Sequence, residues 1–277
     1  MLFRSVLLAA GALLTAAAAA YYRRVAHLAT AAVLVAAAAA SAVSGLGEAH
    51  ARRRARRRWA RLLPPAAFEG ALTTPQGRYL YGRRQEQFNV LTWDNRVQTL
   101  PGRERAGRVL ATLLAQQPAA TRFLVIGGDS LALCRRLLQR DDTAWLVWGA
   151  ADPDYAAGLL RALPADLNFD RSRLVVPQQD IRRWLAREGD RYDMIIVNQP
   201  MPTSLQASRY CSESFYELLS HRLTDRGVVG VRVVGGENVM GPQLGRMGAS
   251  QFYTMSRVFA ELAVKPGDET WFVGATA

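Results

Sequence analysis

The residues of this chain best suited to binding a ligand follow a solid apolar run. Gly127, Gly128 and Asp129 come directly after Phe123–Ile126 and begin a helical stretch. In an α/β fold the first strand-to-helix turn is the usual nucleotide site, and two glycines let the backbone approach a ligand. The turn lacks the GxGxxG pattern, and glycines also occupy such turns where no cofactor binds. A ligand site and a purely structural turn therefore both remain open.

Three further polar residues are candidates for the same site, and each has a structural alternative. Asp152 precedes Pro153 in a turn, where aspartate commonly makes local hydrogen bonds. Asp180 precedes a helical run and can be its N-cap. Gln98 fits the polar end of a strand. Each residue can therefore bind a ligand or serve the fold alone.

Several classes of chemistry are excluded by residue counts. The chain has two cysteines and three histidines without paired ligand spacing, which argues against a zinc site or a disulfide scaffold: Cys134, Cys211, His27, His50 and His221. The cysteines are expected to be small buried thiols. Lysine occurs once, at Lys265, which removes Schiff-base chemistry from almost every position.

The candidate residues require an alternation of strands and helices to position them. The chain has 277 residues, of which 50% are hydrophobic, enough for a large core. Apolar runs followed by helical stretches predict a parallel sheet covered on both faces, an α/β doubly wound fold. The predicted strands are 123–126, 144–148, 174–176, 193–197, 228–234 and 270–275, and the predicted helices are 105–116, 154–163, 181–187, 212–222 and 250–262. Residues 77–100, rich in aromatic and β-branched side chains, predict a small antiparallel sheet.

The first 48 residues predict a transmembrane hairpin. Residues 5–22 contain no charge, and residues 25–46 are interrupted only by His27. Each run is long enough to cross a bilayer as a helix, so we expect spans at about 5–22 and 25–46. A cleaved signal peptide over residues 1–20 is the alternative.

Basic residues are concentrated behind these runs. Of the net charge of +12, residues 1–61 hold ten arginines and one acid, or +9, which leaves +3 for the remainder. Seven arginines fall within ten residues: Arg52, Arg53, Arg54, Arg56, Arg57, Arg58 and Arg61. Beside an apolar span, such a run predicts binding to anionic lipid headgroups and a globular part on the cytoplasmic side of a bacterial inner membrane. Nucleic acid is the alternative partner for these arginines, but the apolar span directly before them favours lipid.

Several motifs together resemble the spermidine synthase family, in the bacterial branch whose synthase-like domain follows transmembrane helices. These motifs are WDNRVQ (93–98), VIGGDS (125–130), ADPD (151–154), QQD (178–180), YDMIIVNQPMP (192–202), RYCSESFYELLSHRL (209–223) and the tail from Gly235. The resemblance implies a small N-terminal β domain at 67–104, a Rossmann-like methyltransferase domain at 105–277, and an Arg-rich juxtamembrane linker at 49–66 between it and the hairpin. It also implies a site for an S-adenosylmethionine-type nucleoside, formed by Gln98, Gly127, Gly128, Asp129, Asp152 and Asp180, and pairing of two copies.

The resemblance also identifies departures at the positions that carry the family's chemistry. Ser130 and Ala150 replace acids that hold the donor, and Asn198 and Met201 replace the two acids of the catalytic loop. Arg103, Gly107 and Arg108 replace an aspartate, a tyrosine and a glutamine at the first helix, and the two arginines are expected near the mouth of the site. Neither an amide nor a thioether takes up a proton at neutral pH, so no catalytic residue is assigned.

These departures predict a membrane-anchored, synthase-like protein without aminopropyl transfer. We expect it to be a structural or nucleoside-sensing subunit of a complex with other membrane proteins. The alternative is an active polyamine aminopropyltransferase or an S-adenosylmethionine-dependent methyltransferase with an altered site. A nucleic-acid-binding module driven by the arginine run is the third hypothesis, and it predicts affinity that falls steeply with salt.

Overall fold

A computed structural model describes residues 2–22, 30, 32–37, 46–187, 189–199, 202, 205–233, 241–267 and 269–276. The chain divides into two compact units, Met1–Phe68 and Glu69–Ala277. The structure does not separate the predicted β domain from the predicted Rossmann-like domain as a unit of its own. The domain boundaries inferred from the sequence therefore stay predictions.

Among its described residues, the N-terminal unit has two long helices, α1 (Leu2–Tyr22) and α3 (Leu46–Trp59). The first predicted membrane span lies within α1, and most of the second lies outside the described residues. Among the residues described, no helix is both long and apolar enough to cross a membrane. The predicted hairpin is therefore not confirmed.

Helix α3 carries six of the seven clustered arginines and ends at a buried tryptophan. The Trp59 indole donates a hydrogen bond to the carbonyl of Pro64 at 2.9 Å, and its ring meets that of Phe68 edge-on. The short helix η1 (Pro65–Ala67) follows. The predicted linker at 49–66 is thus helical over most of its length.

A four-stranded sheet begins the globular unit. Its strands lie in chain order: β1 (Phe68–Thr73), β2 (Arg78–Arg84), β3 (Gln87–Leu91) and β4 (Val97–Leu100). The β2–β3 and β3–β4 pairs are antiparallel, as expected for residues 77–100. Strand β1 was not predicted from the sequence.

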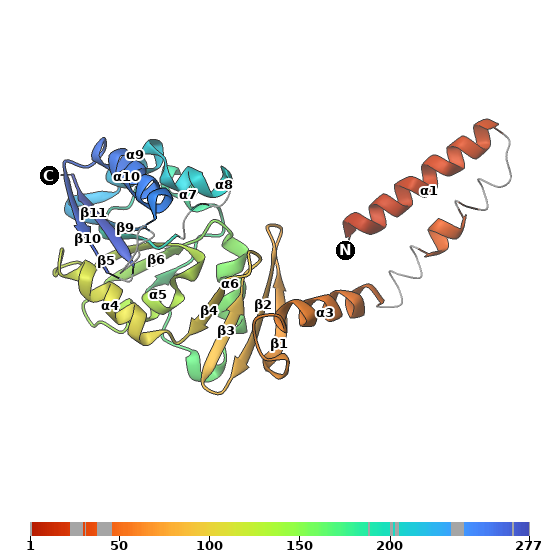
Figure 1. Cartoon of the computed structure of the whole chain (residues 1–277), viewed down its shortest axis with the longest axis horizontal. Helices are drawn as coiled ribbons and strands as arrows, with labels where there is room; N and C mark the ends of the chain where they lie inside the picture. The colour runs from red at the N-terminus through yellow and green to blue at the C-terminus, as the bar shows by residue number, and fades with distance from the viewer. Residues whose placement is uncertain are drawn as a thin grey trace. The chain divides into compact units, whose positions relative to one another are not determined.

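The main sheet has seven strands in the order β10-β11-β9-β8-β5-β6-β7 (Figure 1). Its strands are β5 (Arg122–Ile126), β6 (Trp145–Gly149), β7 (Leu174–Val175), β8 (Tyr192–Val197), β9 (Leu223–Val233), β10 (Glu261–Lys265) and β11 (Thr270–Ala275). The five strands from β9 to β7 are parallel, and β11 runs antiparallel to β9 and β10. The predicted doubly wound sheet is confirmed.

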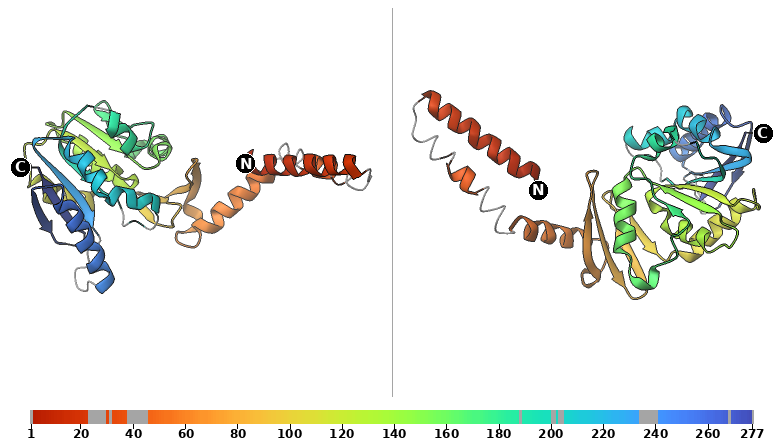
Figure 2. Two further views of the ribbon diagram at one scale, coloured as in Figure 1. Left: turned by 90° about the horizontal axis from the view of Figure 1, so that it is seen from above. Right: turned by 180° about the vertical axis from the view of Figure 1, so that it is seen from behind.

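Helices cover both faces of this sheet (Figure 2). One face packs against α4 (Arg103–Leu114), α5 (Leu131–Leu138) and α6 (Pro153–Ala162). The other packs against α7 (Ile181–Arg187), α9 (Glu213–Ser220) and α10 (Pro242–Ser256). Short helices in the connections are η2 (Gly128–Ser130), η3 (Ala165–Leu167), α8 (Leu205–Ser208) and η4 (Arg209–Cys211).

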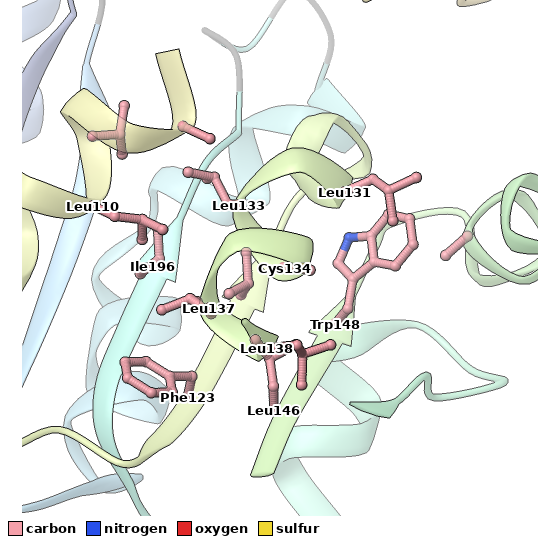
Figure 3. Close-up of a cluster of buried hydrophobic side chains, with 14 of the residues drawn as sticks. Leu110, Phe123, Leu131, Leu133, Cys134, Leu137, Leu138, Leu146, Trp148 and Ile196 are labelled. Atoms are coloured by element: carbon pink, nitrogen blue, oxygen red, sulfur yellow. The ribbon is translucent and has the colours of Figure 1, made fainter. Parts of the chain in front are cut away.

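The core under α5 shows why the strands read as continuous apolar runs. Phe123, Leu137, Leu146 and Trp148 are fully buried between this helix and the sheet (Figure 3). Strands covered on both faces have no solvated side, so alternation is lost. Cys134 is part of this core, as expected, whereas Cys211 is only half-buried.

The last predicted helix was placed too far along the chain. A helix was expected at 250–262, but α10 ends at Ser256 and residues from Glu261 form the edge strand β10. Gly245 and Gly248 weaken the helical pattern in its first half, because glycine is a poor helix former. Only Met255 of this helix is buried.

Candidate functional site

The strand register brings three turns to one edge of the sheet. Ile126 pairs with Gly149 of β6 on one side and with Val197 of β8 on the other. The turns that start at Gly127, Ala150 and Asn198 therefore begin at the same level. The strand order also reverses at β5, and ligands of doubly wound proteins bind at such a switch point.

Gly127 has a conformation that requires glycine. Its φ is +137°, and a Cβ at this position would lie 2.4 Å from the carbonyl oxygen of Asn198. Its carbonyl accepts a hydrogen bond of 2.8 Å from the buried indole of Trp148, and its N–H donates to the carbonyl of Gly149. Both hydrogen bonds tie the turn to β6, and the carbonyl of Asn198, just after β8, leaves no room for a side chain at Gly127.

Asn198 is fully buried and closes this turn. Its amide donates to the carbonyl of Asp129 at 2.8 Å and to the hydroxyl of Ser130 at 3.2 Å. Its Oδ1 accepts long bonds from two guanidinium groups, those of Arg105 at 3.4 Å and Arg232 at 3.3 Å. Asn198 thus serves the fold with both ends of its amide. Met201, the second replaced acid, lies outside the described residues.

Asp129 lies beside two arginines that come from distant parts of the chain. Its Oδ2 is 3.9 Å from Nη1 of Arg105 on α4 and 3.8 Å from Nη1 of Arg232 on β9. Glu269 receives both guanidinium groups, at 2.8 Å and 2.9 Å, through one oxygen, Oε1. We call these four residues the charge cluster: Arg105, Asp129, Arg232 and Glu269.

The register of the main sheet explains how two members of the charge cluster come together. Trp271 of β11 pairs with Arg232 of β9, so Glu269, just before β11, is brought beside that arginine. Burial raises the pKa of Asp129 above its usual value, although Arg105 and Arg232 act in the opposite direction. Burial likewise lowers the pKa of the Arg232 guanidinium, against the pull of Glu269. The two acids and two bases balance in charge.

The two arginines expected at the mouth of the site are exposed and do not belong to the charge cluster. Arg103 is exposed, and Arg108 is exposed and pairs with Glu104 one helical turn earlier. Arg105, on the same helix, faces the site instead. Helical spacing places Arg105 on the opposite side of the helix from Arg103, two residues earlier, whereas nothing in the sequence pointed to Arg232 or Glu269.

Asp152 is committed to structural contacts. Its Oδ1 caps α6 by accepting from the N–H of Tyr155 at 3.2 Å. Its Oδ2 accepts from the hydroxyls of Thr74 at 2.6 Å and Tyr79 at 2.8 Å. The side chain is 5% exposed, so it joins the first sheet to α6.

Gln98 and Gly128 both lie against the side chain of Tyr155. The hydroxyl of buried Tyr155 donates to Oε1 of Gln98 at 2.8 Å, and the ring stacks on Tyr79. A Cβ on Gly128 would approach this ring to 3.2 Å. Burial raises the pKa of Tyr155 well above its usual value. The phenol is therefore neutral and acts as a hydrogen-bond donor.

Asp180 both caps a helix and pairs with an arginine. Its Oδ1 accepts from the N–H groups of Arg182 and Arg183, at the start of α7. Its Oδ2 pairs with the guanidinium of Arg209 and accepts from the hydroxyl of Tyr210 at 2.9 Å. An adenine contact at Asp180 would have to compete with Arg209.

The residues fit an adenosyl nucleoside only in part. The glycine turn permits close approach to the backbone, and Asp129 is within reach of solvent. The turn after β6, however, presents the buried methyl group of Ala150 where a ribose-binding acid would be expected. Within the described residues, no group of three or more His, Cys, Asp or Glu side chains could hold a metal ion.

Part of the chain is similar to two curated proteins. Polyamine aminopropyltransferase 2 and polyamine aminopropyltransferase 1 of Ralstonia nicotianae are each 34% identical to this chain over 116 residues. The match covers 40% of this chain and 22% of either relative, so the chain spans about a fifth of their length. No protein-family profile matches the chain.

Solved structures give a longer match. A spermidine synthase in complex with the transition-state analogue AdoDATO superimposes with a TM-score of 0.62 at 16% identity, covering 76% of this chain and 74% of that one. The predicted resemblance to the spermidine synthase family is confirmed. The spermidine synthase from Thermotoga maritima gives 0.60 at 16%, over 76% and 73% of the two chains. A probable spermidine synthase from Corynebacterium glutamicum gives 0.57 at 14%, over 75% and 80%. This chain is thus spermidine synthase-like in its Rossmann-like fold.

Proposed function

We propose that this spermidine synthase-like chain has lost aminopropyl transfer and acts as a structural or nucleoside-sensing subunit of a membrane complex. The observation that carries the proposal is the charge cluster. The substrates of aminopropyl transfer are cationic amines, whereas here two guanidinium groups adjoin Asp129. One guanidinium alone repels an ammonium group 5 Å away by about 3 kcal/mol at an effective dielectric constant of 20. The two carboxylates that would offset this repulsion are already paired with the two guanidinium groups.

The amide at Asn198, where the family has a catalytic acid, supports the same proposal. The attacking amine must lose a proton, and a carboxylate near the reacting atoms would take it up. Asn198 is an amide whose donors and acceptor are all engaged within the fold. Glu269 shares one oxygen between two arginines, and these contacts occupy that oxygen. The contacts of Asn198 and Glu269 are thus those of residues that stabilise the fold, rather than those of a proton acceptor in aminopropyl transfer.

The test is a transferase assay on the full chain. Purified protein is incubated with decarboxylated S-adenosylmethionine and putrescine, and both spermidine and methylthioadenosine are measured. We expect neither above the protein-free blank, while an active spermidine synthase added to the same mixture yields both. Spermidine formed by the chain itself would overturn the proposal.

An enzyme with an altered site is the second candidate, and Asp129 is the observation in its favour. A carboxylate with a raised pKa beside a glycine turn could serve as a base. It would support aminopropyl transfer or methyl transfer from S-adenosylmethionine. Turnover of labelled cofactor that is abolished in Asp129→Asn would favour this candidate over a non-catalytic subunit.

The membrane part of the proposal rests on α3. This helix has six arginines and one acid, Glu48, and five of the arginines are exposed. Such a helix complements an anionic lipid surface, with each basic residue contributing about 1 kcal/mol. The chain would thus lie at a bacterial inner membrane with its globular unit on the cytoplasmic side, beside other membrane proteins or a second copy.

Flotation with phosphatidylglycerol vesicles tests this role. We expect binding that weakens with salt and falls at least tenfold when Arg52, Arg53, Arg54 and Arg57 become glutamine. The matched control removes the same charge from exposed positions of the globular unit, through glutamine at Arg84, Arg103, Arg161 and Arg226. Equal losses in the two variants, or tighter binding to duplex DNA than to vesicles, would contradict a lipid-binding α3.

A further inference from the structure

The charge cluster has hydrogen-bonding capacity that its members do not use. Oε1 of Glu269 takes the short contacts from Arg105 and Arg232, whereas Asp129 lies 3.8–3.9 Å from the nearest guanidinium nitrogens. These distances exceed hydrogen-bond length. Among the described residues, none donates a hydrogen bond to the Asp129 carboxylate. A carboxylate acceptor and guanidinium donors thus lie side by side.

The cluster is also within reach of solvent. The four side chains keep between 20% and 34% of their surface exposed. Nη1 of Arg105 makes no hydrogen bond to any described residue, and Nη1 of Arg232 makes only the 3.3 Å bond to Asn198. A guanidinium group has five N–H donors in all and binds carboxylates through two parallel N–H bonds. In Arg105, Nε and Nη2 already contact Glu269 and Asn198, which leaves Nη1 for a ligand.

We propose that the charge cluster binds an α-amino acid head group, with the ammonium on Asp129 and the carboxylate on Arg105 and Arg232. Two acids face two arginines, so the cluster is neutral and a zwitterion leaves it neutral. A ligand with an ammonium group and no carboxylate would add a positive charge beside both guanidinium groups. The cluster therefore selects against a decarboxylated ligand.

The position of the cluster indicates which amino acid this is. Asp129 directly follows the glycine turn at the switch point of the sheet, where the proposed nucleoside would lie. This step rests on the nucleoside-sensing form of the proposed function. The ligand class is then an adenosyl amino acid of the S-adenosylhomocysteine or S-adenosylmethionine type, in preference to its decarboxylated counterpart.

Three adenosine thioethers that differ only in the head group test the inference by calorimetry on the full chain. S-adenosylhomocysteine carries both charges, 5′-(3-aminopropylthio)-5′-deoxyadenosine carries the ammonium alone, and methylthioadenosine carries neither. We expect S-adenosylhomocysteine to bind at least tenfold more tightly than the aminopropyl compound. Equal affinities would overturn the inference.

Variants identify the groups responsible. Arg105→Met and Arg232→Met should each reduce the preference to threefold or less and leave the affinity for methylthioadenosine unchanged. Asp129→Asn should weaken S-adenosylhomocysteine at least fivefold through loss of the ammonium contact. Arg103→Met, an exposed arginine on the same helix, is the control and should change nothing. A thermal melt of each variant verifies that it is folded.

The possible outcomes distinguish the head-group site from the nucleoside-sensing role on which it rests. Binding of methylthioadenosine without any preference for S-adenosylhomocysteine overturns the head-group site and leaves nucleoside sensing intact. Failure of all three compounds to bind overturns both. Spermidine formation in the transferase assay overturns the proposed loss of activity alone.

Discussion

The turns after β5 and β6 begin at the same level of the sheet and each carries an aspartate, yet the two aspartates differ in what they can do. Asp152, after β6, accepts three hydrogen bonds from Thr74, Tyr79 and the backbone of Tyr155. Asp129, after β5, has two long ion pairs and remains partly exposed. Place in the fold is therefore not enough to assign a function. The neighbours decide whether a carboxylate is available to a ligand.

The largest effect should come from the glycine that shapes the first turn. Gly127→Ala would force a side chain into a positive φ and into contact with the carbonyl of Asn198, which cannot move without disturbing β8. We expect the free energy of unfolding to fall by about 4 kcal/mol. Chemical denaturation measures it.

The control for this variant lies in the other turn. Ala150→Gly makes the reverse change at the equivalent position after β6, where only a buried methyl group is lost. It should cost about 1 kcal/mol. Similar losses in the two variants would show that the turns do not differ in backbone strain.

The second largest effect on stability is expected at Asp152, whose carboxylate accepts three hydrogen bonds within the fold. Asp152→Ala removes the cap of α6 and leaves the hydroxyl of Tyr79 without its acceptor, so we expect a loss of about 2–4 kcal/mol in the free energy of unfolding. Asp152→Asn keeps one oxygen and should lose less. Asp225→Asn, at a side chain that is 98% exposed, should be neutral. A loss under 1 kcal/mol for Asp152→Ala would mean that the two aspartates are equivalent.

The smallest effect is expected at Asp129, and it depends on pH. Because the pKa of Asp129 is raised in the folded chain, its ionised form opposes folding, and this opposition disappears as the pH falls towards about 4, the usual aspartate value. Asp129→Asn should therefore match the wild type within about 1 kcal/mol at pH 7. The wild type should gain stability relative to the variant between pH 7 and pH 4.

Denaturation of both proteins across this pH range provides the measurement. Loss of wild-type stability relative to Asp129→Asn on acidification would mean that the arginines outweigh burial at this carboxylate. Asp129 would then be a committed ion-pair partner, and the contrast with Asp152 would be smaller.

The sequence predicted the position of the candidate site better than it predicted the side chains that surround it. Apolar runs followed by glycine or aspartate located the turns, because strands covered on both faces leave a strong local pattern. The partners of those turns are not local. Arg105 and Glu269 are 164 residues apart. Glu269 is brought beside Arg232 by the register between β9 and β11. Arg103 and Arg108, which the sequence singled out, lie on the same helix as Arg105 but are exposed.

The lack of a local sequence pattern also explains the errors in the predicted elements. Edge strand β10 and the first half of α10 have few buried residues, so neither shows the periodicity that marks an element. Ser130, Ala150 and Asn198, by contrast, lie in or directly after well-defined elements. Their packing could be described as soon as the strands were paired.

The hydrogen bond from the indole of Trp148 to the carbonyl of Gly127 couples a chromophore to the glycine turn. Substitution with a fluorinated tryptophan would give this side chain a resonance of its own in a fluorine spectrum. That resonance would move when the turn changes and stay still when a compound merely adheres to the arginine helix. The protein thus carries an internal reporter that distinguishes occupation of its sheet edge from attachment at its N-terminal unit.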